Sequence, residues 1–331
     1  MLKFNEEEIL SNMRAALALR PEMEKILDQV EHEGIRNVCW LGIGGTWASC
    51  MQAVVLMKER SAREVFALNA AEYNTTGDRR VGKGTFIVIS SVTGTTEEMI
   101  AAVRKSQEAG AKVLGFVNKV DTPLADMVDW CLTAQQNEQL KFFMVADYLM
   151  HLEGVFPDYE KCYQQIDTFV PEGIVAIEKS ADDFGRSFAE KHKADALHYF
   201  VGAGTLYGAT YSYAMCYWEE MHWRRTKSIH SAEFFHGMLE IIDEDTPVTV
   251  FIAEDSQREL GLRVKRFLEH YNRNYTIIDT ADYPLEGLDP AYRSRISHMI
   301  MHAVTNRIDA HMSDLNQHDM SLRRYYRTVK Y

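Results

Sequence analysis

The fold is decided by the stretch NVCWLGIGG, residues 37–45, a run of apolar side chains that ends in glycines. A short continuous apolar run predicts a strand that is buried on both faces, and the glycines predict a tight loop directly after it. A helix is predicted from about 46 to 59, and further strands are predicted at EVFALNA, at 85–91 (TFIVISS) and at 111–118 (AKVLGFVN). Because strands and helices alternate, we expect a parallel sheet with helices on both faces.

The second half of the chain repeats this order. ALHYFVGAG at 196–204 is again an apolar run that ends in glycines, and 247–279 again reads strand, helix, strand. A repeat of this length indicates duplication of a whole domain rather than a solenoid. The sequence therefore predicts an α/β protein of two flavodoxin-like domains. We expect N-terminal helices and the first domain in 1–160, and a linker helix, the second domain and a C-terminal tail in 161–331.

Two segments lie between these repeats. LKFFMVADYLMHLEGVF (140–156) predicts a buried helix, and 157–173 is the most linker-like part of the chain. In open parallel sheets, ligands bind beyond the carboxyl ends of the strands. The loops after residues 44, 91 and 204 are therefore candidate ligand sites.

The composition excludes several classes of protein. The chain has 331 residues, of which 46% are hydrophobic, so it can form one large or two ordinary folded domains. Its net charge of −12 argues against a nucleic-acid partner, because phosphate backbones require a basic surface. Its five cysteines form no CxxC pair, no apolar run approaches 18 residues, and the N-terminus does not resemble a signal peptide. We therefore expect a cytoplasmic protein without membrane insertion.

The loop SSVTGTTE (90–97) joins a predicted strand to a predicted helix and is rich in hydroxyl groups. Backbone amides at a helix N-terminus, together with hydroxyl donors, favour a bound anion such as phosphate. The same residues would also form an ordinary helix cap, and the two roles are compatible. No lysine follows the glycine, so the loop is not a nucleotide P-loop.

The glycine loops do not indicate a nucleotide cofactor. GIGGTWAS (42–49) fails the GxGxxG pattern because Trp47 stands at the third glycine position, and in GAGTLYG the last glycine, Gly208, comes one position late. No cofactor is therefore predicted. The glycines of the first loop would instead let a sugar approach the backbone closely.

Titratable side chains first gather in YSYAMCYWEEMHW (211–223), which predicts a mostly buried helix. Adjacent residues of a helix point about 100° apart, so only one of Glu219 and Glu220 can face a site directly. Periodicity does not decide which of them does. We interpret Glu219 as part of a solvated acidic edge.

A second group follows in SIHSAEFFHG (228–237), where His230, Glu233 and His236 recur at a spacing of three. A helix or an irregular turn could gather them, and titratable groups held against apolar walls have the shifted pKa values that proton transfer requires. The alternative is a helix whose phenylalanines fill the core; we interpret the two phenylalanines and Trp218 as walls of a site. Histidine and glutamate at this spacing can ligate zinc, but there is no HExxH motif and no metal site is predicted.

At these residues the sequence resembles a known family. GIGGTWAS, SSVTGTTEE and EEMHWRRTKSIHSAEFFHGMLEIID are together similar to the double sugar isomerase (SIS) domain family, which includes the isomerase half of glucosamine-6-phosphate synthase. The resemblance covers nearly the whole chain and is greatest to the bacterial fructosamine-6-phosphate deglycases; HSxEFxHGxxEI is its most specific motif. It implies a 6-phosphorylated sugar amine as substrate, no cofactor, and a homodimer or higher homo-oligomer with shared active sites.

The resemblance also implies roles for single residues. Glu220 corresponds to the glutamate that moves the proton, and His236 to a histidine that acts as an acid or opens the sugar ring and reaches the site from the neighbouring subunit. Glu233 and His230 are expected in the substrate site, Glu233 as a residue that orients a histidine. The positions that contact the sugar or its phosphate correspond to Gly44, Gly45, Thr46, Ser91, Thr93 and Thr96.

The C-terminal tail departs from the synthase. The lysine that forms a Schiff base there corresponds most nearly to Tyr325 or Tyr326, and Lys330 lies too close to the end to replace it. This departure fits a substrate that already carries nitrogen at C1. The sequence does not indicate which amine the substrate carries. The basic residues of RRTK (224–227) and the arginine pair before Tyr325 could contact an α-carboxylate of that amine, or they could be solvated surface.

The implied activity is that of a deglycase, which uses acid–base chemistry through an enaminol to split a fructosamine 6-phosphate. One alternative is a sugar-phosphate aldose–ketose isomerase or an amino-sugar-phosphate deaminase, because related enediol chemistry serves both. Another is a regulatory module that senses a sugar phosphate. The acidic charge and the Glu220/His236 pair argue against the regulatory module.

Overall fold

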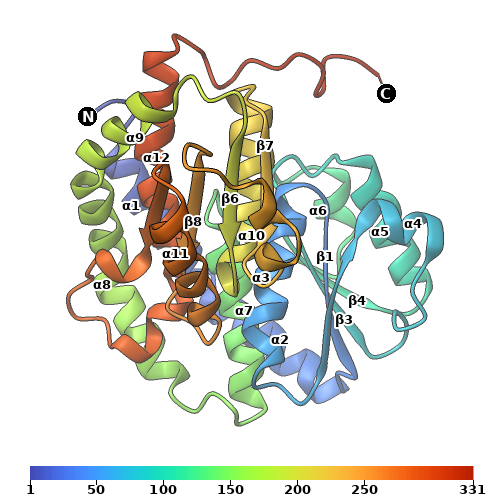
Figure 1. The fold of residues 1–331 in the computed structure, drawn as a ribbon. Coiled ribbons are helices and arrows are strands. Elements are labelled where there is room, and N and C mark those ends of the chain that lie inside the picture. Colours follow the sequence, from blue (N-terminus) through green and yellow to red (C-terminus); the bar gives the residue numbers. More distant parts are fainter. Residues whose placement is uncertain (331) are drawn as a thin grey trace. The chain divides into compact units, whose positions relative to one another are not determined.

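The computed structural model describes residues 1–330 and contains two parallel sheets (Figure 1). The chain divides into two compact units: an N-terminal unit, Glu6–Pro171, and a C-terminal unit, which consists of Met1–Asn5 and the chain from Glu172 onward. Each unit contains one sheet, which confirms the predicted α/β class with two flavodoxin-like domains. The domain boundary predicted between residues 160 and 161 stays a prediction.

The sheet of the N-terminal unit has five strands in the order β2-β1-β3-β4-β5. The chain runs from β1 outward to β2 and then returns to β3 on the other side, so the strand order reverses between β1 and β3. The strands are β1 (Asn37–Gly42), β2 (Glu64–Asn69), β3 (Thr85–Ser91), β4 (Lys112–Val117) and β5 (Trp130–Leu132). The helices are α1 (Glu6–Leu17), α2 (Arg20–Glu33), α3 (Gly45–Lys58), α4 (Ala70–Thr76), α5 (Glu97–Glu108), α6 (Pro123–Met127), α7 (Glu138–Leu152) and the first part of α8 (Tyr159–Ser180).

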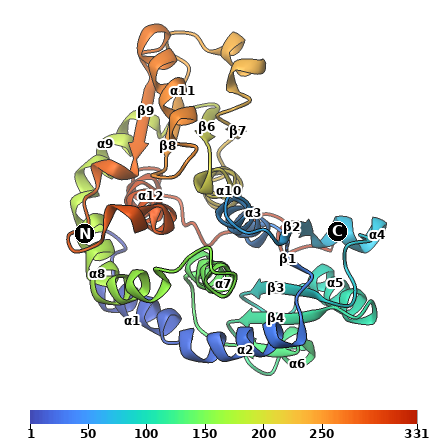
Figure 2. The same cartoon turned by 90° about the horizontal axis from the view of Figure 1, so that it is seen from below.

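Both faces of this sheet are covered by helices. Cys39 and Leu41 of β1 face a core that they share with α4, α5 and α6; of these helices, α5 and α6 lie beside β3 and β4 in Figure 2. Trp40 points the other way and packs against Phe142 of α7, with ring centroids 5.0 Å apart. Every residue of β1 and β3 is buried, as expected for central parallel strands without polar alternation. The predictions for 37–45 and for a buried helix in 140–156 are confirmed.

The sheet of the C-terminal unit has four strands in the order β7-β6-β8-β9, so its order reverses between β6 and β8. Its strands are β6 (His198–Gly202), β7 (Thr226–His230), β8 (Val248–Ile252) and β9 (Tyr275–Asp279). Its helices and shorter turns are α9 (Asp182–His192), α10 (Thr205–Ser212), η1 (Tyr213–Met221), η2 (Phe234–His236), η3 (Met238–Ile241), α11 (Arg258–Tyr271), η4 (Thr280–Asp282), η5 (Pro290–Arg295) and α12 (Ser297–Leu315).

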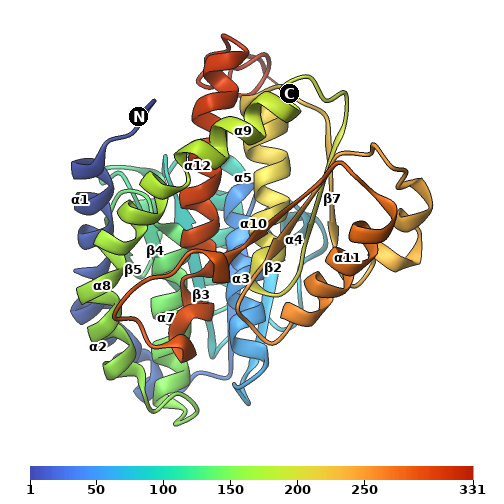
Figure 3. The same cartoon turned by 60° about the vertical axis from the view of Figure 1, so that its left-hand side comes forward.

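This second sheet is also covered on both faces. Val201 and Val250 pack against Val264 of α11 on one face, while Phe200 on the other face packs against Trp218, with ring centroids 5.0 Å apart. Helix α9 packs along α12 (Figure 3), where Arg307 is fully buried and donates to Asp182. The linker-like segment 157–173 is mostly helical, as part of α8. In the part of the chain that the structure describes, no helix is both long and apolar enough to cross a membrane.

The helix predicted over 211–223 has an unexpected geometry. Helix α10 continues directly into η1, which is a π-helix of nine residues. A π-helix has a wider turn than an α-helix and is frequent at functional sites. Sequence periodicity cannot predict it, because the apolar positions only indicate that some helix buries this face. Glu219 is exposed, as predicted, whereas Glu220 is partly buried.

Candidate active site

The hydroxyl-rich loop follows β3 at the point where the strand order of the N-terminal unit reverses. Ser91 accepts a hydrogen bond from the amide of Gly94 at 3.0 Å, and Gly94 has φ +67° with no room for a Cβ, which would lie 2.0 Å from the hydroxyl oxygen of Thr122. Thr96 is the N-cap of α5, yet its side chain makes no capping hydrogen bond. The Thr96 hydroxyl and the first amides of α5 can therefore bind an anion.

The first glycine loop lies beside it, because β1 and β3 are paired. Gly44 has φ +60°, and a Cβ there would meet no atom within 4 Å, so this surface of the loop is open. Thr46 donates a hydrogen bond to Glu138, the first residue of α7, at 2.8 Å. The sequence analysis did not identify Glu138. Its position shortly after the last strand of the sheet, where ligand sites of parallel sheets lie, could have indicated it.

A buried lysine lies one turn further along α7. Lys141 donates to the carbonyl oxygen of Ala134 at 3.0 Å, and burial lowers the pKa of Lys141 to about 8, although Glu138 opposes this shift. A single lysine within the apolar run LKFFMV was the sequence signal for it.

The equivalent loop of the C-terminal unit is closed by its own side chains. Asp255 accepts hydrogen bonds from the amide of Thr205 at 2.7 Å and from the Thr205 hydroxyl at 2.9 Å, and Gln257 accepts from the amide of Gly204 at 3.2 Å. The amides that would bind an anion at the start of α10 are thus already bonded, one to a carboxylate and one to a side-chain amide oxygen. The candidate site that the sequence places after residue 204 is filled from within the protein.

This contact makes Gly204 hard to replace. Gly204 has φ +61°, and a Cβ there would lie 2.1 Å from a carboxylate oxygen of Asp255. We expect Gly204→Ala to lower the free energy of unfolding by about 1–3 kcal/mol more when Asp255 is present than when it is alanine, because only the carboxylate causes the overlap. Chemical denaturation of the four proteins of this double-mutant cycle measures the difference. Equal costs in both backgrounds would contradict the overlap.

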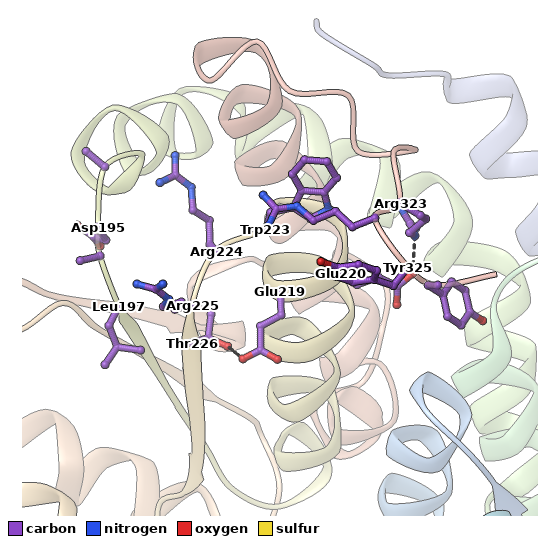
Figure 4. Close-up of a pocket in the computed structure, with 14 residues that line it drawn as sticks. Asp195, Leu197, Glu219, Glu220, Trp223, Arg224, Arg225, Thr226, Arg323 and Tyr325 are labelled. Carbon is purple, nitrogen blue, oxygen red and sulfur yellow. Dashed lines mark hydrogen bonds and ion pairs between the residues drawn. The ribbon is translucent and has the colours of Figure 1, made fainter. Parts of the chain in front are cut away.

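Glu220 is the last residue but one of the π-helix and lies on the wall of a pocket of about 960 Å³ in the C-terminal unit (Figure 4). Its carboxylate accepts a hydrogen bond from the Nε of Arg323, a residue of the tail, at 2.8 Å. Glu219 turns toward the sheet and accepts from the hydroxyl of Thr226 at 2.7 Å. Of the two adjacent glutamates, Glu220 therefore contacts the tail, and Glu219 contacts the start of β7.

A histidine–aspartate cluster lies behind one wall of this pocket. Asp195 accepts hydrogen bonds from the Nδ1 atoms of His192 and His198 at 2.8 and 2.9 Å, and His198 also bonds the hydroxyl of Thr249. Burial alone would raise the pKa of Asp195, but the two histidines outweigh it and lower that pKa to about 2; burial lowers the pKa of His198 to about 4. The two imidazoles thus hold an ionised carboxylate. Within residues 1–330 these three form the one cluster with metal-ligand spacing.

His230, Glu233 and His236 are not on one helix. His230 ends β7, Glu233 follows in a turn, and His236 ends the short 3-10 helix η2. They are joined by main-chain hydrogen bonds, from the Glu233 amide to His230 and from the His236 amide to Glu233, both of 2.9 Å. The Glu233 side chain bonds neither histidine among the described residues, and it is exposed, as is His236. Its orienting role stays a prediction.

The aromatic residues of this region belong to the core. Phe234 and Trp218 are fully buried, and Phe235 packs with Phe234 against Phe267 of α11. Full burial contradicts the interpretation of Phe234 and Trp218 as walls of a site, whereas for the half-buried Phe235 it stays a prediction. Their burial follows from the strand and turn geometry, which directs the phenylalanines under α11 and leaves the neighbouring histidine in solvent.

The sequence of the N-terminal unit matches a known domain. Residues 34–150, which include all five strands and both loops at the strand reversal, match the family model of the SIS domain. This part of the chain is an SIS domain. The prediction of an SIS domain is thereby confirmed for the N-terminal unit.

Two enzymes are similar to this chain over nearly its whole length. Fructosamine deglycase FrlB of Bacillus subtilis (strain 168) is 25% identical, over 96% of this chain and 99% of that protein. Fructoselysine 6-phosphate deglycase of Escherichia coli (strain K12) is 22% identical, over 92% of this chain and 90% of that protein. The predicted relationship to deglycases is confirmed at the level of distant, full-length similarity.

Solved structures share the fold of this chain. A crystal structure from Bacillus subtilis, described as a candidate phosphosugar isomerase, has a TM-score of 0.89 and 24% identity, covering 96% of this chain and 99% of that one. The C-terminal domain of glucosamine-fructose-6-phosphate aminotransferase from Francisella tularensis has a TM-score of 0.76 and 14% identity, covering 95% and 96%. The predicted relationship to the synthase is confirmed in the fold.

Proposed function

We propose that the protein is a fructosamine-6-phosphate deglycase, which converts a 6-phosphorylated 1-amino-1-deoxyfructose and water into glucose 6-phosphate and a free amine or amino acid. The proposal is supported by the two deglycases that match nearly the whole chain. The observation that carries it is Glu220, a partly buried carboxylate at the end of a π-helix, which opens onto a pocket large enough for a small molecule.

Glu220 acts as the base in this proposal. It removes a proton from C1 of the substrate, which gives an enaminol, and protonation at C2 then gives the C1 imine of glucose 6-phosphate. Water adds to C1, the bond between C1 and nitrogen breaks, and the amine leaves with a proton. His236 acts as the general acid that opens the sugar ring. Each step is a proton transfer or a hydrolysis, so the residues need no cofactor.

The phosphate of the substrate is assigned to the loops of the N-terminal unit. The free hydroxyl of Thr96 and the N-terminus of α5 support this assignment, as does the open glycine loop beside them. The closed loop at Gly204 leaves the C-terminal unit without an equivalent site. The residues proposed to contact the sugar or its phosphate are Gly44, Gly45, Thr46, Ser91, Thr93 and Thr96, with His230 and Glu233 as further substrate contacts.

Replacing Thr96 tests the phosphate loop. Thr96→Val keeps the shape of the side chain and removes its hydroxyl, so we expect the KM for the phosphorylated substrate to rise about 3- to 10-fold, as for the loss of one hydrogen bond. Because the hydroxyl makes no capping bond, the thermal unfolding midpoint is expected to stay the same. Thr95→Val is the matched control, and an equal rise of KM in that variant would contradict the assignment.

A product assay tests the reaction itself. The protein is incubated with fructoselysine 6-phosphate, and free lysine and glucose 6-phosphate are measured; equal amounts of both are expected. Release of ammonia would indicate a deaminase, and interconversion of ketose and aldose phosphates without amine release an isomerase. Binding of the sugar phosphate without any turnover would indicate a regulatory module.

The proposed active site is shared between subunits of a homo-oligomer, with His236 serving the site of the neighbouring subunit. The exposed position of His236 in the single chain supports this proposal, because a histidine that acts across an interface has to lie at the surface of its own subunit.

A further inference from the structure

The pocket beside Glu220 is rich in arginine, although the whole chain has a net charge of −12. Four arginines line it together with three acidic residues, an indole and two phenol rings. Two of the arginines precede β7 and two belong to the tail, so segments far apart in the sequence supply the charge. The arginines are Arg224, Arg225, Arg323 and Arg324.

The acidic groups of the pocket are already engaged by other partners. Asp195 holds two histidines, Glu219 bonds Thr226, and Glu220 bonds Arg323. Each carboxylate therefore has a donor that is not one of the remaining arginines.

Among residues 1–330, three of the four arginines have no acidic partner. Arg323 is paired with Glu220, whereas Arg224 donates to the neutral side-chain oxygen of Asn316 at 2.9 Å. Neither Arg225 nor Arg324 has a carboxylate within ion-pair distance in that part of the chain. Four arginines and three carboxylates leave the pocket a formal net charge of about +1, which an anionic ligand would neutralise.

Arg324 is held in a defined position. Its guanidinium carbon lies 4.2 Å from the centroid of the Trp223 ring, a cation–π contact. Stacking engages the flat face of the guanidinium and leaves its edge, with the N–H groups, available for hydrogen bonds. That edge matches the two oxygens of a carboxylate.

We propose that this pocket binds the carboxylate of the amino acid from which the sugar amine was formed, with Arg324 as its principal contact. The proposal rests on the proposed deglycase function, and it makes glycated amino acids, rather than glycated simple amines, the preferred substrates. A carboxylate is favoured over the substrate phosphate because the phosphate is assigned to the hydroxyl-rich loop, and because the phenol rings of Tyr325 and Tyr326 on the same wall suit the carbon chain of an amino acid.

The test compares two substrates that differ only in this group: the fructosamine 6-phosphates of glycine and of methylamine. The kcat/KM ratio of the glycine compound to the methylamine compound is measured for the wild type and for Arg324→Met. We expect the ratio to fall about 10-fold in the variant, the effect of a charge-assisted hydrogen bond at a solvent-accessible site. Because the ratio of the variant is compared with the ratio of the wild type, the intrinsic reactivities of the two compounds cancel.

Two further variants sharpen the comparison. Arg186→Met makes the same change on an exposed arginine of α9 outside the pocket, and it is expected to keep the wild-type ratio. Arg324→Lys keeps the charge but not the planar fork, so its ratio should fall between those of the wild type and Arg324→Met. An unchanged ratio in Arg324→Met would overturn the proposal.

Two other outcomes can be distinguished from a loss of the carboxylate contact. If Arg324→Met also weakens inhibition by the product glucose 6-phosphate, the pocket binds phosphate, and the carboxylate assignment fails. If the wild type turns over neither these compounds nor fructoselysine 6-phosphate, the deglycase function fails, and the two compounds are then compared by calorimetric binding. Tighter binding of the glycine compound, lost in Arg324→Met, would still support the carboxylate site, whereas equal affinities would overturn it.

Discussion

Glu220→Gln is expected to lower kcat by a factor of about 10² to 10⁴, the usual contribution of a general base. Glutamine has nearly the same shape and can still contact Arg323, so the fold of the tail should persist, but an amide cannot accept the C1 proton. Single-turnover measurement of amine release with saturating substrate isolates this step from binding. Exchange of the C1 proton with deuterated solvent should be lost in parallel, because it reports the same proton transfer.

The neighbouring glutamate provides the matched control. Glu219→Gln makes the same change one position earlier, where the side chain is exposed and bonds Thr226. Its kcat should stay within about 3-fold of the wild type, since surface substitutions away from a site have small effects. If Glu219→Gln lost as much activity as Glu220→Gln, or if Glu220→Gln kept near-normal turnover, the assignment of the base would be wrong.

His236→Ala is expected to lower kcat by a similar factor, about 10² to 10⁴, because it removes the proposed general acid. The side chain is exposed and no hydrogen bond of its ring is needed for the fold of the described residues, so the unfolding midpoint should not change. His270→Ala, on an exposed histidine of α11, is the control and should retain activity. Normal turnover of His236→Ala would refute this role.

Mixing the two inactive variants tests whether subunits share the site. In a two-fold dimer with shared sites, a mixed dimer of Glu220→Gln and His236→Ala contains one site with both native groups, so mixing should restore up to about a quarter of wild-type activity. If both groups serve the site of their own subunit, mixing restores nothing.

The sequence predicted the parts of this protein that depend on simple patterns. The continuous apolar run before Gly44 and its counterpart before Gly204 are enough to predict two parallel sheets, because central parallel strands are buried on both faces. The exposure of Glu219 was predicted from its place in an acidic run, since periodicity does not distinguish it from Glu220. The burial of the strands depends on local residue type alone.

The remaining features depend on contacts between distant residues. The ion pair between Arg323 and Glu220 joins positions 103 apart in the chain, and no local pattern indicates it. Phe234 was assigned to a site because it adjoins histidines in sequence, but a turn places it in the core and His236 in solvent. The closure of the Gly204 loop could have been foreseen only from the acidic residue that follows β8.

The two halves of the duplicated sequence differ in whether a side chain of the protein occupies the glycine loop. Asp255 is held beside the Gly204 loop by the fold itself, so it occupies the loop in every folded molecule, and a bound anion would have to displace it. Of the two repeated glycine loops, the one at Gly204 is therefore a fixed structural contact, whereas the one at Gly44 has an open surface.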